Sequence, residues 1–90
     1  MNIGIIGNGG REHALCHSLK KSKKINEIFC FPGNAGTSTI AKNININTNE
    51  FEKLKKFFLE KEIKLVIVGP EKPLVDGIVD FFKNENIKIF

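Results

Sequence analysis

The chain of 90 residues has only two cysteines, one arginine and no apolar run longer than four residues. Cys16 and Cys30 are too few for a disulfide scaffold and too far apart for a CxxC motif. We therefore expect two reduced, partly buried thiols in a cytoplasmic protein. A membrane-spanning helix needs about 20 apolar residues in succession, so the sequence predicts none. We also expect no secretory leader, because the first apolar stretch is short and runs into glycines.

The basic residues are uneven in both position and type. The formal net charge is +4, and residues 1–45 carry six basic and two acidic groups, whereas residues 46–90 carry eight of each. This excess suits an anionic ligand or nucleic acid, although a solvated lysine surface gives the same pattern. Thirteen of the fourteen basic residues are lysine, which does not provide the bidentate recognition typical of arginine. The phenylalanines mostly fall at core positions, so nucleic-acid binding has little support.

Strands and helices are expected to alternate along the whole chain, with no repeat and no low-complexity linker. Apolar or alternating runs predict strands at residues 3–6, 28–31, 44–46, 65–68 and 87–90. Helical spacing of apolar residues predicts helices at residues 12–21 and about 50–62, the second capped by Asn49. A further helix is expected to open at Pro73 or Leu74 and to extend through residues 78–82.

This alternation predicts a single α/β domain over residues 1–90. The expected architecture is a Rossmann-like, doubly wound parallel sheet of about five strands with flanking helices. Ligands bind such sheets at the loops that follow the carboxyl ends of the strands. Three loops qualify, at residues 7–11, 32–37 and 69–74, and glycine, proline and asparagine concentrate in the same places. The sequence therefore predicts a ligand site at this edge of the sheet.

The first loop reads GNGGREH at residues 7–13 and leads directly into a helix, whose free N–H groups suit a phosphate. A dinucleotide-binding fingerprint would need glycine or alanine where Glu12 stands, and an acidic residue after the second strand, where the chain reads FPGN. A Walker P-loop would need Lys-Ser/Thr where the chain has Gly10-Arg11. Phosphate binding and a tight turn without a ligand both stay open, whereas NAD and a Walker-type site are disfavoured.

The side chains of this loop have both functional and purely structural interpretations. Arg11 lies near a helix N-terminus, where a cation does not complement the macrodipole, so it suits a ligand phosphate, a carboxylate partner or a surface salt bridge. Glu12 favours the first turn of a helix. His13 suits a ligand contact or proton transfer, or packing within the domain. His13 and His17 have no evident third partner for a zinc site.

The second and third loops are less specific. Asn34 can offer its amide to a polar ligand, or the loop can be a plain turn. Two prolines stiffen the third loop, which presents Glu71 to hydroxyls or an amine, or simply to solvent. No Ser–His–Asp arrangement and no nucleophile with an adjacent base is present, so no catalytic residue is assigned.

Three motifs and their order carry a family resemblance. They are GNGGREHAL at residues 7–15, FPGNAGT at 31–37 and VGPEKPLVDGIVD at 68–80, with KIF at 88–90 as the final strand. Together they closely resemble the N-terminal domain of the glycinamide ribonucleotide synthetase (phosphoribosylamine–glycine ligase) family. The resemblance covers nearly the whole chain, while residues 38–64 match only as a pattern.

The resemblance implies an ATP-grasp ligase of purine biosynthesis. Such enzymes activate glycine with ATP and magnesium as an acyl phosphate, and the amine of 5-phosphoribosylamine attacks it to give glycinamide ribonucleotide. The N-terminal domain of the family is a Rossmann-like module that helps to hold the ribosyl phosphate, so ATP and Mg²⁺ are expected to bind outside this segment. The family enzyme continues into an ATP-grasp unit and a C-terminal domain. The chain therefore looks like a substrate-binding fragment, which we expect to be inactive alone.

Substrate-binding residues are carried over from the family by motif. The resemblance implies sugar-phosphate or ribose contacts for Gly9, Gly10 and Arg11, with Glu12 and His13 nearby. It implies that Asn34 and Gly36 complete the wall of this substrate site. It also implies that Glu71 faces the ribose. It implies no catalytic or metal-binding residue in this segment. The expected partners are the small-molecule substrate and the missing domains, with no nucleic acid and no membrane. The alternatives are a stand-alone, non-catalytic module that binds a sugar phosphate or nucleotide and, less favoured, an NAD-dependent redox domain.

Overall fold

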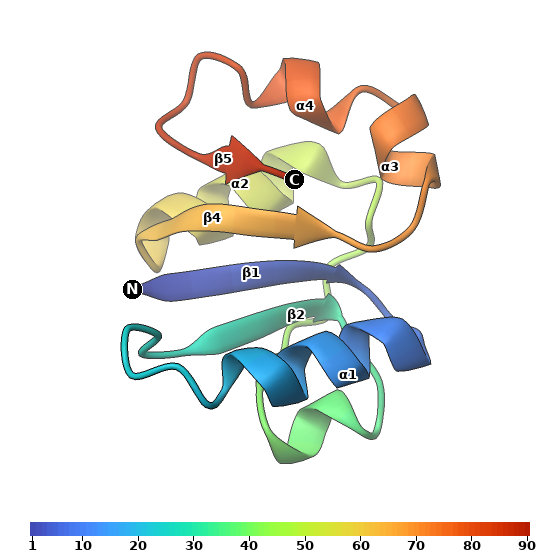
Figure 1. Cartoon of the computed structure of the whole chain (residues 1–90). Coiled ribbons are helices and arrows are strands. Elements are labelled where there is room, and N and C mark those ends of the chain that lie inside the picture. The colour runs from blue at the N-terminus through green and yellow to red at the C-terminus, as the bar shows by residue number, and fades with distance from the viewer.

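A computed structural model describes all of residues 1–90 as a five-stranded parallel sheet with helices on both faces (Figure 1). The elements are β1 (Asn2–Gly7), α1 (Gly10–Leu19), β2 (Ile28–Pro32), the 3₁₀ turn η1 (Thr37–Thr39), β3 (Lys42–Asn43), α2 (Phe51–Glu60), β4 (Ile63–Val68), α3 (Lys72–Val75), α4 (Ile78–Phe81) and β5 (Lys88–Ile89). The strand order is β3-β2-β1-β4-β5, so the predicted Rossmann-like α/β fold is confirmed. None of the helices is long and apolar enough to span a membrane.

Strand β1 lies at the centre of the sheet and pairs in parallel with β2 and β4. Its register sets Ile5 opposite Cys30 of β2 and opposite Ile67 of β4. Ile5 and Ile6 of β1 are completely buried, because apolar groups cover both faces of a central parallel strand. This explains why a short run without a polar alternation nevertheless forms a strand.

Two apolar clusters pack on opposite faces of the sheet. On one face, α2 and α4 contribute Phe58 and Ile78 to an eleven-residue cluster. On the other face, α1 packs over β1 and β2 with a five-residue cluster around Cys16 and Cys30. Figure 1 shows α1 on the near side and the paler α2 behind β4. Strands β2 and β3 follow on one side of β1, and β4 and β5 follow on its other side, which makes the sheet doubly wound.

The two cysteines are buried more completely than expected. Both are fully inaccessible, and the Sγ atoms of Cys16 and Cys30 lie 3.2 Å apart as free thiols. Burial raises the pKa of Cys16, and it raises the pKa of Cys30 to about 12. Because the thiolate is the reactive form, these thiols are chemically protected in the folded chain.

Three local expectations differ from the structure. The third strand is Lys42–Asn43, earlier than the predicted 44–46, because η1 turns the chain back sooner. The helix expected after Pro73 is two short helices, since Gly77 takes a left-handed conformation (φ 92°) between them. Helix α2 is preceded by Glu50 rather than capped by Asn49. The carboxylate of Glu50 instead accepts the backbone N–H of Asn47 at 2.9 Å.

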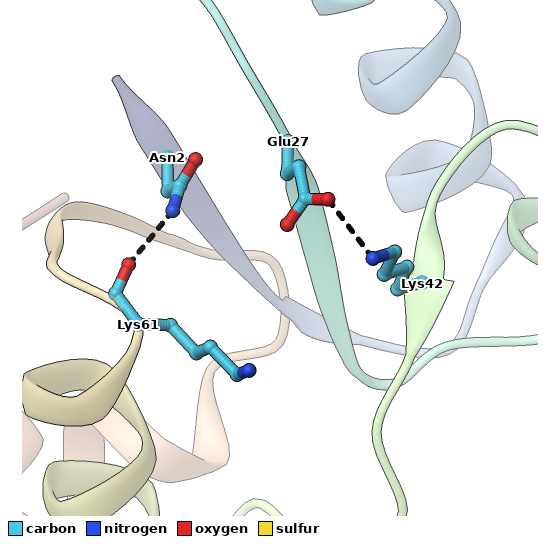
Figure 2. A network of polar contacts seen from close by, with 4 residues as sticks. All are labelled: Asn2, Glu27, Lys42 and Lys61. Atoms are coloured by element: carbon cyan, nitrogen blue, oxygen red, sulfur yellow. Dashed lines mark hydrogen bonds and ion pairs between the residues drawn. The ribbon is translucent and has the colours of Figure 1, made fainter.

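Polar contacts tie the amino ends of the strands together (Figure 2). Asn2 Nδ2 at the start of β1 donates to the carbonyl oxygen of Lys61, 2.7 Å away, just before β4. Lys42 Nζ at the start of β3 lies 2.9 Å from Glu27 Oε1, just before β2. The ion pair with Lys42 lowers the pKa of Glu27, although both side chains are exposed. The glycine-rich loops lie at the opposite edge, at the carboxyl ends of the strands.

Candidate functional site at the carboxyl edge of the sheet

The three predicted loops meet at one edge because their strands end in register. Gly7, the last residue of β1, pairs with Pro32 at the end of β2, and Ile6 pairs with Val68 at the end of β4. The following loops therefore leave the sheet side by side. Sequence reasoning placed this edge from the predicted carboxyl ends of the strands, where glycine, proline and asparagine also concentrate.

Glu12 lies inside this edge rather than facing solvent. Its side chain is 6% exposed, and its Oε2 accepts a hydrogen bond from the backbone N–H of Gly9 at 3.1 Å. The carboxylate fills the space left by two glycines, since a Cβ at either Gly7 or Gly69 would overlap it. A buried carboxylate needs such partners to offset its desolvation. Glu12 thus holds the ends of β1 and β4 at a fixed distance.

Arg11 makes a second link to the third loop. Its Nη2 donates to the carbonyl oxygen of Gly69 at 2.6 Å, so the only arginine bridges the start of α1 and the end of β4. The side chain is otherwise exposed. This contact uses part of the guanidinium and leaves other N–H groups for an anion, because arginine has five donors.

Asn34 links the second loop to the first. Its Nδ2 donates to the carbonyl oxygens of Asn8 and Gly9, each 3.0 Å away. Its Oδ1 accepts the N–H of Thr37 at 2.9 Å, and buried Thr37 in turn lies 2.7 Å from Asn43 Oδ1. The amide that sequence reasoning offered to a ligand is therefore engaged with the protein, and it positions the glycine-rich loop.

His13 packs on the second loop. A Cβ at Gly36 would overlap the imidazole ring at Nδ1, so the small residue is needed for this approach. His17 lies one turn further along α1 and is exposed. No group of three or more His, Cys, Asp or Glu side chains is arranged to hold a metal ion.

A polar cleft opens at this edge beside the linked loops. Its volume is about 410 Å³, and none of its nine lining residues is hydrophobic. The lining residues come from four loops and from the short helix α3: Gly7, Asn8, Pro32, Asn47, Thr48, Asn49, Pro70, Lys72 and Asp76. Lys72 Nζ lies 3.2 Å from Asp76 Oδ2, which holds the cation at the rim. We call this feature the polar cleft.

Sequence reasoning missed most of the polar cleft. The fourth loop, residues 47–49, follows β3, and the rule that ligands bind after the carboxyl ends of strands could have found it. None of the eight motif-derived residues lines the polar cleft itself. Gly9 and Asn34 support its wall, while Glu71 is exposed just before α3. Arg11 and Glu12 line a separate groove against β4. Substrate contacts by these residues stay predictions.

Comparisons with known proteins match the whole chain. The family described as "Phosphoribosylglycinamide synthetase, N domain" matches residues 1–90. This chain belongs to that family. The resemblance noted from the three motifs is thereby confirmed.

Relatives of this N domain are named phosphoribosylamine–glycine ligases. The protein of Caldanaerobacter subterraneus is 50% identical over 90 residues, which are 100% of this chain and 22% of that relative. The protein of Haemophilus influenzae is 51% identical over 92 residues, 100% of this chain and 21% of that relative. The crystal structure of the ligase from Thermotoga maritima superposes with a TM-score of 0.66 at 28% identity, covering 100% of this chain and 19% of that one. The chain thus spans about a fifth of the length of these relatives.

Proposed function

We propose that these residues act as the N domain of a cytoplasmic phosphoribosylamine–glycine ligase and form the ribosyl phosphate side of its active site. The complete reaction joins glycine to 5-phosphoribosylamine at the expense of ATP, giving glycinamide ribonucleotide, ADP and phosphate in purine biosynthesis. Membership of the family and the names of the relatives support this assignment.

The observation that carries the proposal is the polar cleft at the carboxyl edge of the sheet. A sugar phosphate needs hydrogen-bonding groups for its hydroxyls and positive potential for its phosphate. The polar cleft offers Asn8, Thr48 and Asn49 for the first purpose and, for the second, Lys72, which is paired with Asp76 in the unbound chain. Amide, hydroxyl and charged side chains line the polar cleft beside Pro32 and Pro70, and its lining includes no aromatic side chain that could stack on a cofactor ring.

The glycine-rich loop adds a second source of positive potential. The first-turn N–H groups of a helix have no partners within the helix, and they carry the positive end of its dipole. Gly10 opens the ten-residue helix α1, and nothing lies within 4 Å of the position where its Cβ would be. A phosphate can therefore approach this backbone closely. We propose Gly9, Gly10 and Arg11 for the phosphate side and Glu71 for the ribose hydroxyls.

ATP and Mg²⁺ belong to the remainder of the proposed enzyme. No cluster of metal-binding side chains is present in these residues, and the glycine-rich loop lacks the Lys-Ser/Thr of a Walker site. In the proposed enzyme ATP supplies the phosphoryl group that activates glycine. Within these 90 residues, the polar cleft and the loops at its edge bind and orient the sugar phosphate.

A titration followed by ¹⁵N–¹H NMR tests the proposal. Glycinamide ribonucleotide and ribose 5-phosphate are each expected to shift the amide signals of residues 8–12, 47–49, 71 and 72. Replacing Lys72 by alanine should weaken binding about tenfold, or roughly 1.4 kcal/mol, because a charge-assisted contact is lost. Lys64→Ala is the matched control, since Lys64 is an exposed lysine near the amino end of β4. Shifts confined to the amino edge, or tighter binding of NADH than of either sugar phosphate, would contradict the proposal.

A further inference from the structure

The two faces of the sheet are covered unequally. Helices α2 and α4 pack on the face that carries Val66 and Val68 of β4, and both valines are buried. Leu65 and Ile67 point to the other face, because successive residues of a strand alternate. Both are only half-buried, since α1 packs over β1 and β2 and does not extend across β4 (Figure 1). The α1 face of β4 is therefore incompletely covered.

A groove lies between α1 and β4 on this face. Its volume is about 530 Å³, and Arg11, Ala14, Leu15, Ser18 and Ile67 are among its lining residues. We call it the α1–β4 groove. Leu15 and Ile67 give it aliphatic walls, whereas amide, hydroxyl and charged side chains line the polar cleft together with Pro32 and Pro70. The two hollows are thus chemically different and suit different occupants.

Strand β5 extends this apolar surface. Phe90 N donates to the carbonyl oxygen of Val66 at 2.9 Å, and Val68 N donates to the carbonyl oxygen of Phe90 at 2.7 Å. These two bonds set Phe90 beside Ile67 on the same face of the sheet, where its side chain is 66% exposed. Lys88 shares this face two residues earlier, and Arg11 lies at the opposite end of the α1–β4 groove. An occupant would therefore meet an apolar strip with a basic side chain at each end.

We propose that the α1–β4 groove is the docking surface for the polypeptide that follows the N domain in the complete ligase. The relatives are about five times longer than this chain, so most of the enzyme lies outside these residues. A chain that continues from Phe90 begins beside Ile67, at the rim of the α1–β4 groove. The occupant is an amphipathic segment with apolar side chains over Leu15 and Ile67 and an acidic side chain near Lys88. This inference rests on the proposed function, because it requires a ligase with further domains.

Side-chain footprinting in a chimera tests the proposed docking. Residues 1–90 replace the matching residues of the Caldanaerobacter subterraneus ligase, and carbene labelling is compared between the chimera and the 90-residue chain. Labelling of Leu15 and Ile67 is expected to fall roughly fivefold in the chimera, because contact removes most of their accessible area. Val75 is the internal control: it is 81% exposed on α3, outside the α1–β4 groove, and should change by less than about twofold.

Two variants test whether the apolar contact is responsible. Ile67→Glu should restore the labelling of Leu15 in the chimera, whereas Val75→Glu should not. Circular dichroism of the 90-residue chain with Ile67→Glu checks that the domain still folds. Equal labelling of Leu15 and Ile67 in the chimera and in the isolated chain would overturn the proposal. A chimera that is labelled throughout like an unfolded chain would also overturn the proposal, because the remainder of the relative should pack against the α1–β4 groove.

The outcomes separate docking from function. A chimera with ligase turnover and an unprotected α1–β4 groove would keep the proposed function and overturn the docking surface. A protected α1–β4 groove without turnover would support docking and count against the proposed function. Sedimentation of the 90-residue chain tests the remaining possible occupant, which is a second copy of the same chain. If the isolated chain forms a dimer in which Leu15 and Ile67 are already protected, the occupant is a second copy and the proposal is wrong.

Discussion

The side-chain amide nitrogen of Asn34 lies 3.0 Å from the carbonyl oxygen of Gly9, and this contact joins the second loop to the first. The same Nδ2 donates to the carbonyl oxygen of Asn8, so both amide hydrogens are used. A side chain that looked available for a ligand instead orders the glycine-rich loop, which is the proposed phosphate site. Such an arrangement keeps the backbone N–H groups of the glycine-rich loop in place before a ligand binds.

Asn34→Asp is expected to destabilise the chain. The carboxylate cannot donate, so two carbonyl oxygens lose their partner and face an anion, at a cost of about 1–3 kcal/mol in the free energy of unfolding. Asn45→Asp is the matched control, because Asn45 is exposed between β3 and α2 and should change stability by less than about 0.5 kcal/mol. Urea unfolding followed by circular dichroism is suitable, since the chain has no tryptophan or tyrosine. Equal midpoints for the two variants would contradict the linking role of Asn34.

Gly69→Ala should also be destabilising, for a steric reason. A Cβ at Gly69 would overlap the carboxylate of Glu12, and overpacking of this kind costs about 1–3 kcal/mol. Gly10→Ala is the control in open space, and it should stabilise the chain by about 0.4–1 kcal/mol by restricting the unfolded state. The free energies come from urea unfolding of each variant.

A double-mutant cycle identifies the cause of the Gly69 effect. In a Glu12→Ala background the overlap is absent, so adding Gly69→Ala should cost less than it does in the wild-type chain. If Gly69→Ala costs the same in both backgrounds, the overlap with Glu12 is not the source of the destabilisation.

The order of the elements was predictable because apolar runs and glycine–proline pairs mark it locally. The run at residues 65–68 ends in Gly69-Pro70, and it became the carboxyl end of β4 as expected. The split of the last helix was not predictable from apolar spacing, since Ile78 and Phe82 keep a helical interval. It depends on the left-handed backbone of Gly77. Because glycine adopts positive and negative φ with similar ease, a lone glycine within an amphipathic pattern does not predict its own backbone conformation.

The site was predictable as an edge but not as a set of contacts. Glycines at the ends of β1 and β4 indicated close approach, yet they did not reveal that Glu12 is the group that approaches. Glu12 reads as an ordinary first-turn carboxylate, and its burial arises from two strands brought together by the sheet. Cys16 and Cys30 illustrate the same limit, since 14 positions separate them in sequence and 3.2 Å separate their sulfur atoms. Tertiary proximity of this kind has no local signal.

The buried thiols predict a loss of stability in mildly alkaline solution. Burial raises the pKa of Cys30 from the ordinary 9.0 to about 12 and raises that of Cys16 in the same direction. In the unfolded chain the thiols release their protons near pH 9, while the folded chain retains them, so the unfolded state binds fewer protons. The free energy of unfolding should therefore be unaffected well below pH 9 and fall as the pH rises above it.

Urea unfolding in the presence of reductant, between about pH 7 and pH 10, measures this slope. The chain has no tyrosine, so no phenol titrates in this range, and the lysines are common to every variant. The variant carrying both Cys16→Ala and Cys30→Ala should be less stable at neutral pH but should lose less stability toward pH 10. An equal slope in the variant and the wild type would show that the thiols are not the source.

The 90 residues alone should give no turnover with ATP, glycine and 5-phosphoribosylamine. The polar cleft is proposed to bind only the sugar phosphate, and the chain spans about a fifth of the length of the ligases that it matches, so we expect the ATP site in the remainder. Binding one substrate without the group that activates the other leaves the reaction uncatalysed. Glycine-dependent release of phosphate measures the activity, with the full-length Caldanaerobacter subterraneus ligase as the positive control. Turnover by the purified chain would mean that the ATP site lies within these residues. The proposal that residues 1–90 bind the sugar phosphate while the remainder of the enzyme binds ATP would then be wrong.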